Sequence, residues 1–175
     1  MKKPTYNVLF LGSGNCARSI MAEAILNREG RERFCAYSAG IQAHEQLDRH
    51  AIELLSRLNF DTSNAQPKSW EQLAGLRGLD FDFIFTVCDA AKMLPQSMWK
   101  GSPIFARWDI PDPASVQGNA ATIKLAYADA FRMLSNRIMI FINLPLRSLD
   151  RMAMQREIGS INDAGRASQK AIVAA

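Results

Sequence analysis

Short apolar runs alternate with apolar stripes of helical period along most of this chain, and this alternation limits the folds open to it. Runs typical of buried strands lie at residues 6–11, 34–38, 81–87 and 104–108. Helical stripes lie at residues 19–28, 47–58 and 118–141, the last over about six turns. Strands that alternate with helices pair in parallel through right-handed crossovers, with helices on both faces. The pattern predicts an α/β three-layer sandwich around a four-stranded parallel sheet.

Length and composition are those of one folded domain. The chain has 175 residues, of which 48% are hydrophobic and 22% charged, close to the average of globular proteins. Disordered, collagen-like and coiled-coil chains are therefore excluded. The alternating pattern ends near Pro145. Residues 1–147 are predicted to form the domain, and residues 148–175 a peripheral helix with a flexible C-terminal tail.

Membrane spans and signal peptides have patterns that this sequence lacks. The longest apolar run, residues 138–146, is about half of the roughly 18 residues that a span requires. It is also interrupted by Asn143 and Pro145. Near the N-terminus, Pro4 and the early Gly12 leave the apolar segment too short for a signal peptide. We therefore expect a cytoplasmic protein with no membrane partner.

Cysteines, histidines and charges narrow the chemistry further. Cys16, Cys35 and Cys88 show neither a metal-ligand spacing nor a disulfide framework, so no metal site is expected. His44 and His50 lie on different helical faces and are expected to be solvated. The net charge is +4, but the Lys and Arg residues are scattered. A small anionic ligand is therefore favoured over nucleic acid, and the oligomeric state is left open.

The segment between the first strand and the first helix carries most of the chemical information. Backbone N–H groups and the helix dipole at such a turn favour an anion. The Arg18 guanidinium adds a fork that can bind two oxygens of a tetrahedral oxyanion. The predicted anion-binding residues are the eight consecutive residues of this loop: Gly12, Ser13, Gly14, Asn15, Cys16, Ala17, Arg18 and Ser19.

The same loop also fits the relaxed dinucleotide fingerprint, through Gly12, Gly14 and Ala17. That interpretation needs an acidic residue about 20 positions on, where it would bind the ribose hydroxyls. Residues 38–40 are Ser, Ala and Gly, and the Gly-Lys-Ser/Thr of a Walker loop is also missing. A compact phosphate-sized anion is favoured, with a nucleotide-binding protein as a lesser alternative.

Four motifs follow one another along the first part of the sequence. The first surrounds the loop and comprises Val8-Leu9-Phe10-Leu11, Gly14-Asn15, Arg18-Ser19 and Met21-Ala22-Glu23-Ala24; the others are Tyr37-Ser38-Ala39-Gly40, Thr86-Val87-Cys88-Asp89 and Trp108-Asp109-Ile110-Pro111-Asp112-Pro113-Ala114. In kind and order these motifs resemble those of the low-molecular-weight protein tyrosine phosphatases and of the thioredoxin-coupled arsenate reductases that share their fold, over roughly the first 145 residues. The resemblance implies the phosphatase fold and, for an active protein, arsenate reduction or phosphomonoester hydrolysis. No cofactor is implied, apart from thioredoxin or another thiol reductant if arsenate is reduced.

The sequence departs from the family at the residue that carries the chemistry. In the family, the residue six positions before the arginine is the cysteine whose thiolate attacks phosphorus or arsenic. Gly12 stands at that position here, whereas the loop's backbone donors and Arg18 remain. The sequence therefore predicts a protein that binds phosphate, sulfate or arsenate. The alternative is a catalytically inactive module for an oxyanion or a phosphorylated protein.

Three further residues have a possible catalytic role. Cys16 is either a displaced nucleophile, with its pKa lowered by the helix end and Arg18, or a half-buried loop thiol. Cys88 is a core thiol or, as the resemblance implies, the second member of a disulfide relay whose third cysteine is absent from residues 90–96. Asp112 is either the general acid that the resemblance implies or part of a surface turn.

Overall fold

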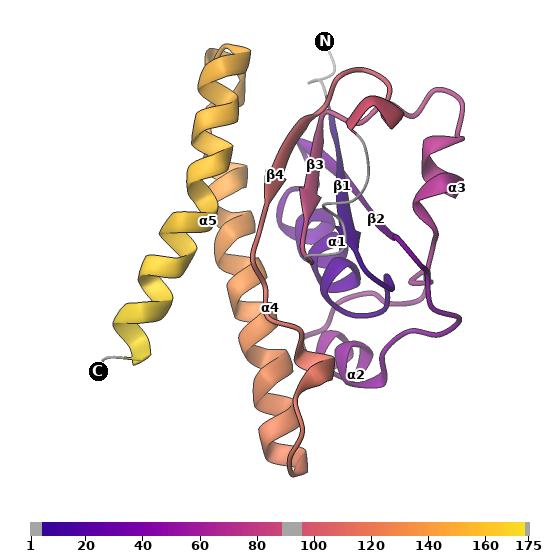
Figure 1. Cartoon of the computed structure of the whole chain (residues 1–175), viewed down its shortest axis with the longest axis vertical. Coiled ribbons are helices and arrows are strands. Elements are labelled where there is room, and N and C mark those ends of the chain that lie inside the picture. Colours follow the sequence, from indigo (N-terminus) through magenta and orange to yellow (C-terminus); the bar gives the residue numbers. More distant parts are fainter. Residues whose placement is uncertain (1–4, 89–95, 174–175) are drawn as a thin grey trace.

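A four-stranded parallel sheet is the centre of the computed structural model, which describes residues 5–88 and 96–173, with side chains up to residue 164. The strand order is β2-β1-β3-β4, and each neighbouring pair is parallel (Figure 1). This confirms the predicted α/β fold. The strands are β1 (Tyr6–Gly12), β2 (Phe34–Gly40), β3 (Phe83–Thr86) and β4 (Ile104–Arg107).

Helices cover both faces of the sheet, which gives the three layers (Figure 1). The α-helices are α1 (Arg18–Glu29), α2 (Arg49–Arg57), α3 (Trp70–Ala74), α4 (Ala120–Asn143) and α5 (Arg151–Val173). Within the described residues there are also the short 3₁₀ helices η2 (Gln96–Met98), η3 (Pro113–Ser115) and η4 (Leu146–Ser148).

The central strand β1 separates two hydrophobic cores because successive side chains of a strand point to opposite faces. Val8 and Phe10 belong to the larger core, which α1, α2 and α4 cover. Leu9 and Leu11 belong to the smaller core, together with Leu73 of α3. Burial on both faces explains why this strand appears in the sequence as a nearly continuous apolar run.

The C-terminal helix α5 contributes to the larger core. Ile158 and Ile161 are 0% and 1% exposed and pack within it. In Figure 1, α5 runs beside α4 and β4. The sequence predicts a peripheral helix here, and the structure adds that the helix has one buried face. The division of the chain at residues 147 and 148 stays a prediction.

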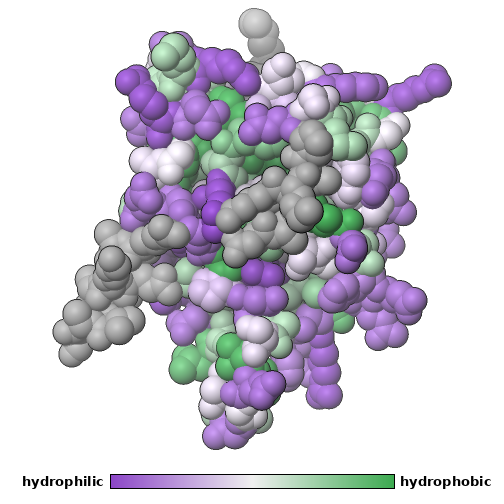
Figure 2. Space-filling model, viewed as in Figure 1, coloured by the Kyte–Doolittle hydropathy of each residue, from purple (hydrophilic) through white to green (hydrophobic). Residues whose placement is uncertain are grey.

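Hydrophilic residues cover most of the molecular face shown in Figure 2. Among the described residues, no helix has the length and apolar content needed to cross a membrane.

Candidate functional site

The loop of residues 12–19 leaves the carboxyl end of β1, where parallel strands of an open α/β sheet place their ligand sites. Gly12 ends the strand and lies opposite Gly40 of β2. Arg18 begins α1, whose N-cap residue Ala17 makes no side-chain capping hydrogen bond. The first N–H groups of the helix are therefore not occupied by a capping side chain.

The backbone carbonyls of the loop are turned outward. They accept hydrogen bonds from N–H groups of residues 41–48, with N···O distances of 2.8–3.1 Å: Ile41 to Gly12, Gln42 to Ser13, His44 to Gly14 and Asp48 to Cys16. In a planar trans peptide, the N–H of the next residue points opposite to the carbonyl. The N–H groups of Ser13, Gly14, Asn15 and Ala17 therefore point inward, and within the described residues they donate no hydrogen bond.

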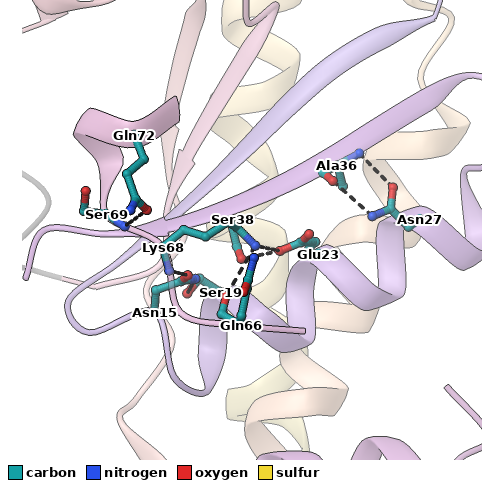
Figure 3. Close-up of polar contacts among 10 residues, drawn as sticks. All are labelled: Asn15, Ser19, Glu23, Asn27, Ala36, Ser38, Gln66, Lys68, Ser69 and Gln72. Atoms are coloured by element: carbon teal, nitrogen blue, oxygen red, sulfur yellow. Dashed lines mark hydrogen bonds and ion pairs between the residues drawn. The ribbon is translucent and has the colours of Figure 1, made fainter. Parts of the chain in front are cut away.

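Asn15 fixes the bend of the loop. Its backbone is in the left-handed region, with φ of 51°, and its side chain is 1% exposed. The carboxamide accepts from the backbone N–H of Lys68 at 2.7 Å and donates to Ser19 Oγ at 2.9 Å (Figure 3). Asn15 therefore links the loop to residue 68 and to the first turn of α1.

Residues missed by the sequence analysis surround this bend. Glu23 of α1 accepts from the Ser38 hydroxyl and pairs with Lys68 Nζ at 3.5 Å (Figure 3). The Lys68 carbonyl accepts from Gly40 N–H at 2.8 Å. These contacts join α1, β2 and residue 68 around Asn15, and no local sequence pattern reveals them because the partners are far apart along the chain.

His44 packs directly on the loop, although it is exposed and the sequence predicts a solvated side chain. A Cβ atom at Gly14 would lie 2.5 Å from its imidazole ring. A side chain at position 14 would therefore displace the exposed His44 ring from the loop. His50 is also predicted to be solvated, but its ring lies against that of Tyr127, with 5.3 Å between the ring centroids, and its Nδ1 is buried.

Arg18 and Asp112 meet at the site. The Arg18 side chain is 11% exposed, and its Nη2 lies 3.0 Å from the Asp112 carboxylate. Its Nη1 donates to the Ile110 carbonyl at 3.0 Å. Asp112 is 42% exposed and also caps η3 by accepting from Ala114 N–H. The segment of residues 110–112 thus holds the guanidinium from two sides.

Gly12 has little space for a side chain. A Cβ atom there would lie 2.9 Å from Ser19 Oγ and 3.3 Å from Ser19 Cβ. Ser19 is 1% exposed. A side chain at position 12 therefore requires the Ser19 side chain to move. This movement affects the hydrogen bond that Asn15 Nδ2 donates to Ser19 Oγ.

Cys16 does not have the environment of an activated thiol. It is half-buried and packs against the larger core. Burial is the main cause that raises its pKa, and the charges of Asp48 and Asp112 raise it further. A backbone hydrogen bond and Arg18 act in the opposite direction but more weakly. Of the two interpretations of Cys16, a displaced nucleophile with a lowered pKa or a half-buried loop thiol, the raised pKa favours the second.

Cys88 and Trp108 lie in the two cores, whereas Cys35 of β2 is half-buried and donates to the Tyr37 hydroxyl at 3.3 Å. Cys88 is buried after β3 in the smaller core. Trp108 is fully buried in the larger core, where its ring stacks on that of Phe85 with 4.2 Å between the ring centroids. Most of residues 90–96, where a relay would need a further cysteine, lies outside the described residues. The described residues contain no cluster suited to a metal ion.

The family model of the low molecular weight phosphotyrosine protein phosphatases matches residues 7–151. The chain belongs to this family. Among curated relatives, the arsenate reductase of Oceanobacillus iheyensis is 29% identical over 138 residues, which cover 77% of this chain and 93% of the relative. The arsenate reductase of Bacillus licheniformis is 32% identical over 125 residues, covering 67% and 80%.

Solved structures of the family share the fold. The low molecular weight protein tyrosine phosphatase of T. tengcongensis has a TM-score of 0.61 and 25% identity, covering 77% of this chain and 96% of that one. An arsenate reductase solved in a phosphate-binding state has a TM-score of 0.60 and 21% identity, covering 77% and 98%. Wzb of Vibrio vulnificus, solved with benzylphosphonate, has a TM-score of 0.58 and 22% identity, covering 78% and 97%.

Proposed function

We propose that this chain binds a tetrahedral oxyanion, such as phosphate, sulfate or arsenate, in the loop of residues 12–19. The observation that carries the proposal is the outward rotation of the loop carbonyls, which leaves a set of inward N–H groups beside Arg18. Such a nest at a helix N-terminus favours negative charge. The phosphate and benzylphosphonate bound by family members of the same fold support this proposal.

The proposed binding is non-covalent. Gly12 has no side chain that could attack phosphorus or arsenic, and the raised pKa keeps Cys16 in its less nucleophilic thiol form. The protein is thus proposed to be a binding module for an oxyanion or for a phosphorylated protein. Asp112 pairs with Arg18, so an arriving anion must share the guanidinium with this carboxylate or replace it.

The second candidate is the enzymatic activity of the relatives. Their arsenate reductase function favours it, with Asp112 as the acid, Cys16 as a displaced nucleophile and Cys88 as a second thiol. Arsenate reduction would then consume thioredoxin or another thiol reductant. The raised pKa of Cys16 disfavours this candidate.

Removing the Arg18 guanidinium tests the proposed binding. Arg18→Ala is expected to weaken phosphate binding at least about tenfold in isothermal titration calorimetry, because hydrogen bonds to charged groups contribute about 1.5–3 kcal/mol. Arg49→Ala is the matched control, since it removes an equal charge from a side chain that is 85% exposed. Equal phosphate affinity of the unsubstituted protein and Arg18→Ala would contradict the proposed site.

Restoring a thiol at position 12 separates binding from catalysis. The unsubstituted protein is expected to bind phosphate without hydrolysing p-nitrophenyl phosphate or reducing arsenate with thioredoxin. Gly12→Cys is expected to hydrolyse p-nitrophenyl phosphate, because it places a thiol at the start of the loop that Arg18 closes. Gly12→Ala is the control, because it displaces Ser19 without adding a thiol. Turnover by the unsubstituted protein that Cys16→Ser abolishes would establish the second candidate instead.

A further inference from the structure

Helix α5 lies beyond the segment that defines the family, because the family model ends at residue 151, where α5 begins. It packs beside β4, the last strand in the sheet order (Figure 1). Two of its side chains bind backbone carbonyls of this region: Arg151 Nη2 donates to Ser102 at 2.7 Å and Gln155 Nε2 donates to Phe105 at 2.8 Å. The addition is therefore joined to the sheet by specific polar contacts.

A third polar side chain of α5, Asn162, binds the chain just after β4. Its Oδ1 accepts from the backbone N–H of Asp109 at 2.9 Å, and its Nδ2 donates to the Asp109 carboxylate at 3.1 Å. Arg137 of α4 lies 3.5 Å from the same Oδ1. The carboxamide thus holds both the backbone and the side chain of Asp109.

Asp109 is directly followed by the residues that hold Arg18. The Ile110 carbonyl accepts from one guanidinium nitrogen, and the Asp112 carboxylate pairs with the other, each at 3.0 Å. Asp112 is fixed at its far side by capping η3. A four-residue segment therefore carries both partners of Arg18, and Asn162 holds the end of it that lies nearer to β4.

We propose that Asn162 is a positioning residue of the anion site, through which α5 fixes the segment that orients Arg18. This inference rests on the proposed function for its effect on binding, but the orientation of Arg18 can be observed without any ligand. Arg107 also pairs with the Asp109 carboxylate at 2.5 Å, but Asn162 is the contact that holds the Asp109 backbone N–H from α5. Loss of the Asn162 carboxamide therefore removes one of the contacts that fix residues 109–112, and the direction of the Arg18 guanidinium is held less firmly.

Asn162→Ala and Gln155→Ala form a matched pair for the test. Each removes a carboxamide of α5 that binds backbone after or within β4, but only Asn162 contacts Asp109. Phosphate affinity is measured by calorimetry and the free energy of unfolding by urea titration. Asn162→Ala is expected to weaken phosphate binding roughly threefold to tenfold, the range set by losing one or two hydrogen bonds. Gln155→Ala is expected to bind phosphate as the unsubstituted protein does.

The second measurement is the NMR resonance of the Arg18 Nε–Hε group in the protein without added phosphate. This resonance is assigned by its loss in Arg18→Lys. It is expected to shift or broaden in Asn162→Ala and to stay unchanged in Gln155→Ala. An unchanged Arg18 resonance in Asn162→Ala, or an equal change in both variants, overturns the positioning role. If the unsubstituted protein binds no phosphate, the proposed function fails, and the resonance alone decides the role of Asn162. If Asn162→Ala does not fold, Asn162→Ser is measured against the same criteria.

Discussion

Cys16 shows how one side chain can lie in an anion-binding loop without sharing its chemistry. Its backbone carbonyl is bound by Asp48, and its thiol packs against the core rather than standing free in the loop. Burial and the two nearby carboxylates then favour the neutral thiol. Position in the sequence is therefore a poor guide to the ionisation of a cysteine, since the side-chain direction decides which charges it meets.

The raised pKa of Cys16 predicts slow alkylation near neutral pH. The pH at which its reaction with iodoacetamide reaches half of the maximal rate is expected to lie above 9, the ordinary pKa of the thiol, because the thiolate is the reactive form. Because the pKa of Cys16 is higher in the folded than in the unfolded protein, its neutral thiol contributes to the free energy of unfolding in full below pH 9. This contribution is lost as the pH rises through the pKa of the folded state. Peptide mass spectrometry gives the rate of alkylation at Cys16 against pH.

The same peptide from the urea-unfolded protein is the control for this measurement. Its profile is expected to lie at lower pH than that of the folded protein. A folded profile that lies at or below the unfolded one would show an activated thiol and would return Cys16 to the list of possible nucleophiles.

Asp48 joins three elements at the outer side of the loop. It caps α2 by accepting from the N–H groups of His50 and Ala51, and its own N–H donates to the Cys16 carbonyl. Its second carboxylate oxygen accepts from the Tyr127 hydroxyl of α4 at 2.6 Å. Helices α2 and α4 are thereby connected to the backbone that turns the loop carbonyls outward.

The Tyr127 hydroxyl is expected to stabilise this junction. Tyr127→Phe should lower the free energy of unfolding by about 1.5–3 kcal/mol, the usual contribution of a hydrogen bond to a charged group. Tyr6→Phe is the matched control, because its hydroxyl donates to no group within the described residues. Urea unfolding compares the two, and equal losses would show that the bond to Asp48 contributes nothing of its own.

The elements themselves were largely predictable from sequence. Strands buried on both faces leave continuous apolar runs, so β1 and β4 are predicted within two residues of their observed ends. The third run, residues 81–87, is longer than β3 because Phe81 and Val87 are buried without belonging to the strand. The apolar run in the sequence reports which residues are buried, but it does not report which of them pair with a neighbouring strand. At both ends of β3, buried residues therefore lie beyond the paired ones.

The site was predictable only where its residues are contiguous or belong to a familiar motif. Arg18 and Asp112 carry such motifs, although only the structure shows that they pair. Lys68, His44 and Asp48 carry none, because each acts on the loop through its backbone or through a contact that the fold creates. Contacts of this kind depend on tertiary packing, which leaves no periodic trace in a single sequence.

At the scale of the whole molecule, α5 is part of the core and not an appendage. Ile158 and Ile161 fill the larger core beside α4, although they lie beyond the segment matched by the family model. The apolar residues of α5 are widely spaced among polar ones, which is why its sequence predicts only a peripheral helix. Among the α5 side chains that the structure describes, Ile158 and Ile161 are the buried ones.

Truncation of one of these side chains tests the contribution of α5 to stability. Ile161→Ala is expected to lower the free energy of unfolding by about 2–5 kcal/mol, as for other buried aliphatic side chains. Met152→Ala on the same helix, where the side chain is 78% exposed, should change it by less than about 0.5 kcal/mol. Urea titration of both variants makes the comparison, and a small loss for Ile161→Ala would mean that α5 is only loosely attached.

The placement of α5 along β4 also bears on self-association. An outer strand of a sheet presents unpaired backbone groups to which a strand of another molecule can add. Here the Gln155 carboxamide donates a hydrogen bond to the Phe105 carbonyl of β4. At the opposite edge of the sheet, Ser69 forms an isolated β-bridge with Gly40 of β2. We therefore expect a chain shortened before Arg151 to expose β4 as a template for strand addition by a second molecule.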